Sequence, residues 1–269
     1  MRTIVITGAS SGVGLAAAKQ LAAMGDQIVA VGRDPRRLGA AMAEIRKAAT
    51  GPEPDEVRAD FETLEDVRLV AEHVLSAYEK IDVLANNAGG MLGSYRVTPD
   101  GFEATAQSNH LAPFLLANLL RERLSGGRII GTSSDAHRRA RVDPDDFIGD
   151  PQTWSAWRAY GAAKGENILF AAEAARRWPD ILSVSFHPGL VRTNFGADPA
   201  TRLVYKIWPF LITPQKAGAL LTWLATAPAN ELTTGAYYVG RKVTEPRQWV
   251  TDPELAARLW TSSAQAVNL

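Results

Sequence analysis

Two polar side chains four positions apart, Tyr160 and Lys164, could together move a proton. Residues at this spacing share one face of a helix, so the lysine ammonium would lie beside the phenol. A free tyrosine, with a pKa of about 10, is a poor base at pH 7, but a nearby positive charge favours its phenolate. The pair could therefore act as general acid/base for an alcohol or carbonyl oxygen. The same spacing also fits an ordinary exposed pair, so the interpretation depends on the surrounding elements.

Two further residues could complete such a site. Ser134 follows a predicted strand over 128–132, and its hydroxyl could hydrogen-bond the same substrate oxygen. Asn109 lies four residues before Pro113 in a predicted helix over 101–124. Proline has no N–H, so the carbonyl of Asn109 loses its helical partner. We expect a kink that frees this carbonyl to hold a water, through which the proton could pass to solvent.

A glycine-rich stretch near the N-terminus organises the rest of the chain. It runs Thr-Gly-Ala-Ser-Ser-Gly-Val-Gly over residues 7–14, between a β-branched run at 3–6 and a strong helix former at 15–24. The first N–H groups of a helix have no partners within it, and glycines let the backbone approach phosphates closely. The context favours a dinucleotide diphosphate site over an ordinary tight turn. The predicted binding residues are Gly8, Ser10, Ser11, Gly12, Val13 and Gly14.

The end of the second predicted strand, 27–31, bears on which dinucleotide binds. Gly32 and Arg33 stand there, about 20 residues past the glycines, where this fold reads the adenosine ribose. NAD sites place a carboxylate at this point, whereas a guanidinium can pair with the 2′-phosphate of NADP. Arg37 could help from the next turn, although Asp34 would repel that phosphate. We expect NADP(H), the alternative being that Arg33 is a solvated loop charge.

Two further strand ends carry polar or small residues. Parallel sheets bind ligands beyond the carboxyl ends of their strands. Asp60 could accept a hydrogen bond from the adenine amino group, or it could be an ordinary carboxylate at a helix N-terminus. The cofactor-binding residues predicted at these ends are Asp60, Phe61, Asn86, Ala88 and Gly89.

Strands and helices alternate along the chain, which predicts an α/β fold of the Rossmann type. We expect a doubly wound, mainly parallel seven-stranded sheet with helices on both faces. The predicted strands are 3–6, 27–31, 56–59, 81–85, 128–132, 182–186 and 236–239. The predicted helices are 15–24, one ending near 48, 63–78, 101–124, 154–178, 214–225 and 252–266. No repeat or linker divides the chain, so residues 1–269 are predicted to form a single domain.

Residues 194–212 have no clean period and carry many large apolar side chains, which suits a substrate lid. An apolar lid would admit a hydrophobic substrate and exclude water, although the same residues also fit a core or a partner surface. The four histidines have no ligand spacing, so no metal site is predicted.

Composition excludes several other classes of function. The formal net charge is zero, so no global field favours nucleic acid or an anionic membrane. The chain has no cysteine, which excludes disulfides and thiolate catalysis. No uncharged apolar run reaches the length of a membrane span, and the first strand begins too early for a signal peptide. We therefore expect a cytoplasmic protein.

Taken together, these motifs resemble the short-chain dehydrogenase/reductase family over nearly the whole chain. The resemblance rests on TGASSGVG at 7–14, NNAG at 86–89, the Tyr160 and Lys164 pair and PGLVRT at 188–193. It implies that Asn109, Ser134, Tyr160 and Lys164 form a catalytic tetrad, with Ser134 as the second of a Ser-Ser pair. It also implies that the nicotinamide end is held by Tyr160, Lys164, Pro188, Gly189, Val191 and Thr193.

The sequence is more closely similar to the retinol-dehydrogenase-like branch of that family. SSDAH at 133–137, PFLITP at 209–214 and DPELAARLW at 252–260 carry this likeness, which implies NADP and lipophilic alcohol or carbonyl substrates. The chain departs from the branch at Ala112-Pro113, where glycine is usual, in YGAAK in place of YxxSK, and in lacking an N-terminal membrane anchor. The missing anchor argues against assuming a retinoid. Family members often pair through the helices that contain Asn109 and Tyr160, so a homo-oligomer is expected.

The predicted function is hydride transfer between NADP(H) and a lipophilic secondary alcohol, its ketone or an aldehyde. The alternative is a nucleotide-binding sensor of the same fold without turnover.

Overall fold

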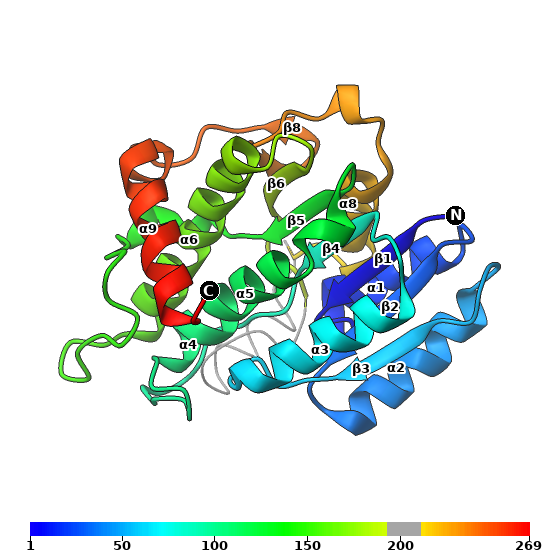
Figure 1. Cartoon of the computed structure of the whole chain (residues 1–269), viewed down its shortest axis with the longest axis horizontal. Helices are drawn as coiled ribbons and strands as arrows, with labels where there is room; N and C mark the ends of the chain where they lie inside the picture. Colours follow the sequence, from blue (N-terminus) through cyan, green and yellow to red (C-terminus); the bar gives the residue numbers. More distant parts are fainter. Residues whose placement is uncertain (193–210) are drawn as a thin grey trace.

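The fold is built on one sheet whose strand order is β3-β2-β1-β4-β5-β6-β7-β8 (Figure 1). The computed structural model describes residues 1–192 and 211–269. The strands are β1 (Thr3–Thr7), β2 (Gln27–Gly32), β3 (Asp55–Arg58), β4 (Val83–Asn86), β5 (Arg128–Thr132), β6 (Leu182–His187), β7 (Tyr237–Val239) and β8 (Lys242–Val243). Neighbouring strands from β3 to β7 are parallel, and β8 pairs with β7 in the antiparallel sense. The Rossmann-type prediction is confirmed, with one strand more than expected.

The extra strand carries no signal that sequence patterns detect. β8 has two residues, both exposed, and follows a turn in which Gly240 has φ +60°. By contrast, β1 and β2 lie inside the sheet and read as continuous apolar runs because helices cover both of their faces. The edge strand β3 alternates between half-buried and exposed residues.

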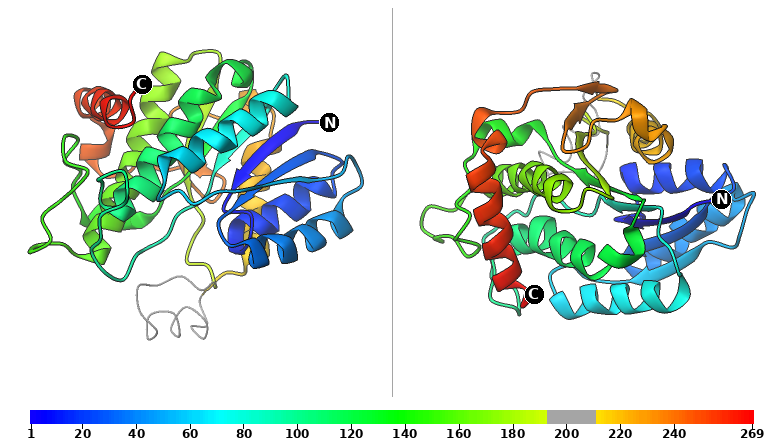
Figure 2. Two further views of the ribbon diagram at one scale, coloured as in Figure 1. Left: turned by 60° about the horizontal axis from the view of Figure 1, so that its bottom comes forward. Right: turned by 45° about the horizontal axis from the view of Figure 1, so that its top comes forward.

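Helices cover the sheet in two layers (Figure 2). One layer contains α1 (Gly12–Ala22), α2 (Pro35–Ala48) and α8 (Pro214–Thr226), and its core includes Leu21, Met42 and Leu221. The other contains α3 (Leu64–Ala77), α4 (Ala104–Ala106), α5 (Ala112–Leu119) and α6 (Ala156–Arg177), with Val70, Leu115 and Leu169 in its core. Short 3-10 turns lie at η3 (Asp135–Arg139), η4 (Ala229–Glu231) and η5 (Gln248–Thr251). No helix in the described ranges is long and apolar enough to cross a membrane.

The uninterrupted helix expected over 101–124 is not observed. The chain instead forms α4, the π-helical turn η1 (Gln107–Leu111), α5 and the 3-10 turn η2 (Arg121–Leu124). Glu103 begins α4 by accepting hydrogen bonds from two backbone N–H groups through its carboxylate. In the wide turn the N–H of Ala112 bonds to the carbonyl of Gln107, five residues back. Pro113 follows directly and cannot donate, so the kink expected from proline takes the form of a π turn.

The helix α9 (Pro253–Ala266) crosses the outer side of α5 and α6 (Figure 1). Trp260 lies against Phe114, Phe170 and Trp178, with ring centroids 5.1, 5.5 and 4.9 Å away. The hydroxyl of Ser263 lies 2.8 Å from Nε2 of the buried His110. The helix face through which pairing was expected is therefore covered by the chain itself.

Candidate active site

The glycine loop after β1 is held in a shape that only glycine tolerates. Gly8 and Gly12 have φ of +69° and +57°. A Cβ at Gly14 would lie 2.4 Å from the carbonyl oxygen of Gly8, so the loop and the first turn of α1 touch through backbone. Ser11 caps α1 without a side-chain hydrogen bond, and the first turn has no acidic residue. Nothing in the cap competes with a diphosphate for the first N–H groups, which fits a dinucleotide.

Two residues that the sequence interpretation left out lock this loop to the next strand. The hydroxyl of Thr7 accepts hydrogen bonds from the backbone N–H groups of Asn87 and Ala88, at 3.0 and 2.9 Å. The side-chain amide of Asn87 donates to the carbonyl of Thr7 at 2.9 Å. Asn87 is the second residue of NNAG at 86–89, a motif that by resemblance stabilises the sheet, and Thr7 is the first residue of the glycine-rich stretch at 7–14. Thr7 and Asn87 set the geometry of the residues that would bind.

The predicted cofactor residue Asn86 faces the helix layer. Its side-chain amide donates to the carbonyl of Pro113 at 3.2 Å, which ties the end of β4 to the start of α5. Its Oδ1 is buried and has no partner among the described residues. A buried acceptor without a partner is costly to the fold.

Asn109, in the π turn, is fully buried and packs against the glycines of the 86–90 segment. Its Oδ1 accepts from the N–H of Gly90 at 3.0 Å, and its Nδ2 donates to the carbonyls of Gly90 and Thr105. Gly89 has φ +148°, and a Cβ there would lie 2.4 Å from Asn109 Oδ1 and 3.0 Å from Lys164 Nζ. Gly89 thus lies between Asn109 and Lys164, two of the predicted site residues.

Tyr160 and Lys164 lie together near the beginning of α6. Lys164 Nζ is 5.4 Å from the centroid of the Tyr160 ring and donates to the carbonyl of Thr132 at 3.2 Å. Lys164 is only 2% exposed, and this burial lowers its pKa to about 8. An ammonium this close stabilises negative charge on the phenol oxygen.

The two serines after β5 have different surroundings. The hydroxyl of the buried Ser133 donates to the carbonyl of Lys164 at 2.6 Å, which fixes α6 to the end of β5. Ser134 is more exposed, and its hydroxyl accepts from the N–H of Ala136 at 3.2 Å in the turn η3. Ser134 therefore keeps its hydroxyl proton for another acceptor, whereas Ser133 uses its own in the fold.

A polar group that was not predicted lies beside Ser134. The hydroxyl of Tyr237 donates to Asp135 at 3.1 Å, and His187 Nε2 is 3.9 Å from the other oxygen of that carboxylate. Burial, Asp135 and the nearby Tyr160 raise the pKa of Tyr237, so Tyr237 stays a neutral donor. Burial lowers the pKa of His187. The position of Asp135 directly after Ser134 was the available signal.

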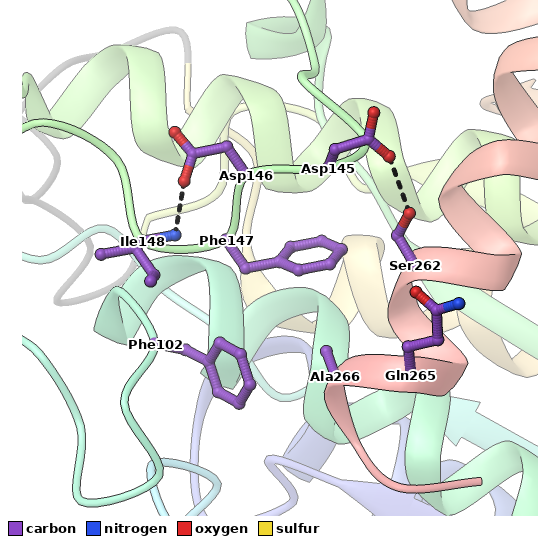
Figure 3. Close-up of a pocket in the computed structure, with 8 residues that line it drawn as sticks. All are labelled: Phe102, Asp145, Asp146, Phe147, Ile148, Ser262, Gln265 and Ala266. Carbon is purple, nitrogen blue, oxygen red and sulfur yellow. Dashed lines mark hydrogen bonds between the residues drawn. The ribbon is translucent and has the colours of Figure 1, made fainter.

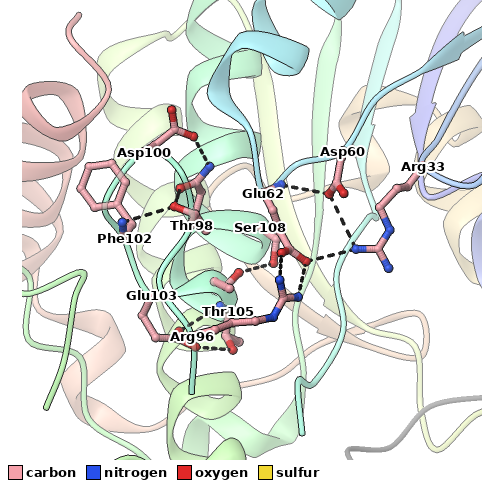
Figure 4. Close-up of polar contacts among 12 residues, drawn as sticks. Arg33, Asp60, Glu62, Arg96, Thr98, Asp100, Phe102, Glu103, Thr105 and Ser108 are labelled. Carbon is pink, nitrogen blue, oxygen red and sulfur yellow. Dashed lines mark hydrogen bonds and ion pairs between the residues drawn. The ribbon is translucent and has the colours of Figure 1, made fainter. Parts of the chain in front are cut away.

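At the adenosine end the predicted arginine is already paired (Figure 4). Arg33 Nη1 lies 3.1 Å from Glu62 Oε1 and 3.6 Å from Asp60 Oδ1. Arg37 is exposed in the first turn of α2, where its N–H is capped by Asp34. The side chain of Phe61 is buried in the core, so only its backbone can meet a ligand.

The segment predicted to border the nicotinamide is described up to Arg192. Gly189 has φ +90°, and a Cβ there would lie 2.9 Å from Ile212. Val191 forms a parallel bridge with Ile212, and the N–H of Arg192 bonds to the Ile212 carbonyl at 2.9 Å. Pro188 begins this turn. Thr193 and the lid predicted over 194–212, apart from its last two residues, lie outside the described residues.

A cavity of about 400 Å³ lies away from these groups, between the 145–148 segment and α9 (Figure 3). Its lining includes Phe102, Phe147 and Ser262, whose hydroxyl donates to Asp145 at 2.8 Å. It contains none of the candidate catalytic residues, so we do not assign it to the reaction. No group of three or more possible metal ligands occurs within 1–192 or 211–269.

Comparison with known proteins shows the family to which the chain belongs. A family model described as short chain dehydrogenase matches residues 2–202, which contain all four candidate catalytic residues. A protein of Streptomyces sp. (strain C5), provisionally named a daunorubicin C-13 ketoreductase, is 53% identical over 267 residues, 99% of this chain and 93% of that protein. Retinol dehydrogenase 13 of Homo sapiens is 33% identical over 281 residues, 100% of this chain and 85% of that protein. A crystal structure of an uncharacterised protein from Mycobacterium paratuberculosis aligns with a TM-score of 0.82 at 30% identity, over 100% of this chain and 94% of that one.

Proposed function

Because the chain belongs to the short-chain dehydrogenase/reductase family, in its retinol-dehydrogenase-like branch, we propose that it is an NADP(H)-dependent oxidoreductase acting on lipophilic ketones, aldehydes or the matching alcohols. The observation that carries this proposal is the buried Lys164 ammonium, 5.4 Å from the Tyr160 ring and beside Gly89. This position, next to the segment predicted to border a dinucleotide, supports proton transfer by the Tyr160 and Lys164 pair.

When bound, nicotinamide dinucleotide supplies or accepts the hydride. Gly8, Gly12 and Gly14 would hold its diphosphate at the beginning of α1, where added Cβ atoms at Gly8 and Gly14 would meet neighbouring backbone. The conformation of these glycines and the open first turn of α1 fit a dinucleotide diphosphate.

In reduction, Tyr160 donates its phenol proton to the carbonyl oxygen of the substrate as that oxygen gains charge. Lys164 stabilises the phenolate that remains, and Ser134 donates a second hydrogen bond to the same oxygen. Asn109 is a positioning residue, because its side-chain amide forms hydrogen bonds with the backbone of Gly90 and Thr105. In oxidation the same groups act in reverse, with Tyr160 as the base.

The names of two relatives support the substrate class. One specifies a ketoreductase and the other a retinol dehydrogenase, and both imply a carbon that exchanges hydride as an alcohol or a carbonyl. We propose that residues 1–269 form a single domain. Within it, we propose the apolar segment 194–212 as the lid over the substrate. We further propose that any homo-oligomer uses a surface other than the outer side of α5 and α6, because α9 covers that side.

The test is oxidation of NADPH with a panel of apolar ketones and aldehydes, followed by absorbance. Tyr160→Phe should lower kcat by at least about 1,000-fold while the Kd for NADPH changes little, because only the proton donor is lost. Tyr78→Phe is the control, since the Tyr78 hydroxyl bonds to Asp55 at the edge of the sheet. NADPH binding without turnover of any substrate would favour the sensor, and turnover that survives in Tyr160→Phe would remove Tyr160 from the mechanism.

A further inference from the structure

Arg33 is held by carboxylates at the point where a 2′-phosphate would need it. Its Nη1 lies 3.1 Å from Glu62 Oε1 and 3.6 Å from Asp60 Oδ1, as Figure 4 shows. The backbone beneath is fixed, because Arg58 donates to the Arg33 carbonyl at 3.3 Å. The Arg33 side chain is 62% exposed, so it can turn while its backbone stays in place.

Glu62 also pairs with a second arginine, Arg96. Arg96 donates to both oxygens of the carboxylate, through Nη2 to Oε1 at 2.6 Å and through Nη1 to Oε2. The Glu62 side chain is only 11% exposed, whereas that of Arg96 is 48% exposed. The contact with Glu62 raises the pKa of Arg96, so Arg96 keeps its charge. Two arginines thus share one nearly buried carboxylate.

We propose that Glu62 and Arg96 determine the coenzyme preference by controlling the release of Arg33, with Glu62 holding Arg33 in the free protein and Arg96 remaining on Glu62 when Arg33 turns to the 2′-phosphate. This inference rests on the proposed NADP(H) function. Glu62 and Arg96 are positioning residues, since they act through Arg33.

The exchange is favourable because it leaves no buried charge unpaired. Removing one partner from a buried carboxylate is strongly destabilising when nothing replaces it. Here the two-pronged contact with Arg96 still satisfies both Glu62 oxygens after Arg33 leaves. Without Arg96, release of Arg33 would strand Glu62. Without the charge on Glu62, Arg33 would keep the longer contact with Asp60 and turn more easily, and the 2′-phosphate would meet one negative charge fewer.

Substitutions at Glu62 and Arg96 should therefore change the ratio of the Kd of NADP⁺ to that of NAD⁺ in opposite directions. Isothermal titration gives the Kd of NADP⁺ and of NAD⁺ for the whole chain and its variants. Glu62→Gln should lower the Kd of NADP⁺ about threefold to tenfold and leave that of NAD⁺ within about twofold. Arg96→Gln should raise the Kd of NADP⁺ about tenfold, again with little change for NAD⁺. In the Arg33→Gln background neither substitution should shift the ratio.

Glu173→Gln is the matched control. Glu173 is also a nearly buried carboxylate between two arginines, Arg176 and Arg177, at the opposite end of α6 from Tyr160. Its loss should cost comparable stability and leave both Kd values unchanged. This separates a general loss of structure from an effect on Arg33.

The outcomes distinguish the inference from its premise. If Arg33→Gln leaves the Kd ratio of NADP⁺ to NAD⁺ unchanged, the role of Arg33 fails, and the inference fails with it. If Arg33→Gln weakens NADP⁺ selectively while Glu62→Gln and Arg96→Gln change the ratio in the same direction or not at all, only the exchange is wrong. Should Glu62→Gln not fold, Arg96→Gln decides alone, because this half-exposed residue can be replaced with less risk.

Discussion

At the scale of single residues, α6 carries two buried ionisable groups, one basic and one acidic, two positions apart. Burial lowers the pKa of Lys164 to about 8, and burial together with nearby Glu103 raises the pKa of Glu166 to about 8. Lys164 faces the candidate active site, whereas Oε2 of Glu166 has no partner in the described part of the chain. The fold therefore bears one electrostatic cost that serves chemistry and another that serves no function we identify.

Glu166→Gln should stabilise the protein in a pH-dependent way. The pKa of Glu166 is higher in the folded than in the unfolded protein, so the free energy of unfolding of the wild type falls as pH rises from about 4.5 to about 8. The variant should gain on the order of a few kcal/mol above pH 8 and almost nothing below pH 4.5. Urea denaturation at pH 4.5, 7 and 9 checks this, and a gain independent of pH would contradict it.

Lys164→Met should be more stable than the wild type when no coenzyme is bound. Because its folded pKa is lowered, Lys164 penalises the fold fully below pH 8, and the penalty shrinks as pH rises towards 10.5. We expect the free energy of unfolding to rise by about 1–3 kcal/mol at pH 7, after the loss of the hydrogen bond to the Thr132 carbonyl is subtracted. Turnover should be abolished. Urea denaturation at pH 7 and 10 measures the gain. The exposed Lys19→Met is the control, and a loss of stability in Lys164→Met at pH 7 would refute the account.

At the scale of elements, the sequence predicts well those strands, helices and loops whose conformation is determined by neighbouring residues. Apolar periodicity located the parallel strands and the main helices, and the strand–loop–helix order located the glycine loop. The π turn was anticipated only as a kink at Pro113, because its form depends on tertiary contacts such as Asn109 with Gly90. Tyr237 contacts Asp135 and Arg96 contacts Glu62 from distant segments, so neither partner could be found by spacing.

Gly14→Ala should disable the glycine loop. The added Cβ would stand 2.4 Å from the Gly8 carbonyl oxygen, a backbone atom that cannot turn aside. The loop must open, so both NADP⁺ and NAD⁺ should bind at least about tenfold more weakly. Titration of both coenzymes measures this.

Gly39→Ala in α2 is the matched control for that loss. A Cβ at Gly39 would meet no atom within 4 Å outside its own helix turn and chain neighbours, so Gly39→Ala should bind coenzyme as the wild type does and gain up to about 1 kcal/mol of stability. Equal binding in Gly14→Ala and Gly39→Ala would show that the close approach at Gly14 is not needed.

At the scale of the whole molecule, α9 closes the outer side of the α5 and α6 layer. Trp260 provides the central contact, stacked on Phe170 with a 3° angle between the rings and 5.0 Å below the Arg177 guanidinium. These contacts join segments far apart in sequence, so α9 covers this side of the layer from within the chain.

Trp260→Ala should weaken the fold and expose a surface that associates. Loss of the aromatic contacts should cost about 2–4 kcal/mol, and the uncovered Phe114 and Phe170 should promote dimers or aggregates. Thermal melting and size-exclusion chromatography measure the two effects. Leu69→Ala, at a side chain 49% exposed on α3, should show neither. A variant of wild-type stability and size would mean that α9 is dispensable as a cover.

The placement of α9 also orders events during synthesis. Ribosomes release the chain from its N-terminus, so α5 and α6 emerge well before the segment that shields them; His110 and Ser263 are 153 positions apart. During that interval the nascent chain exposes the aromatic surface that α9 later covers, and this surface can associate with other chains. Closing so distant a contact is slow, so docking of α9 should be a late folding event and the stage at which chaperones matter most to yield.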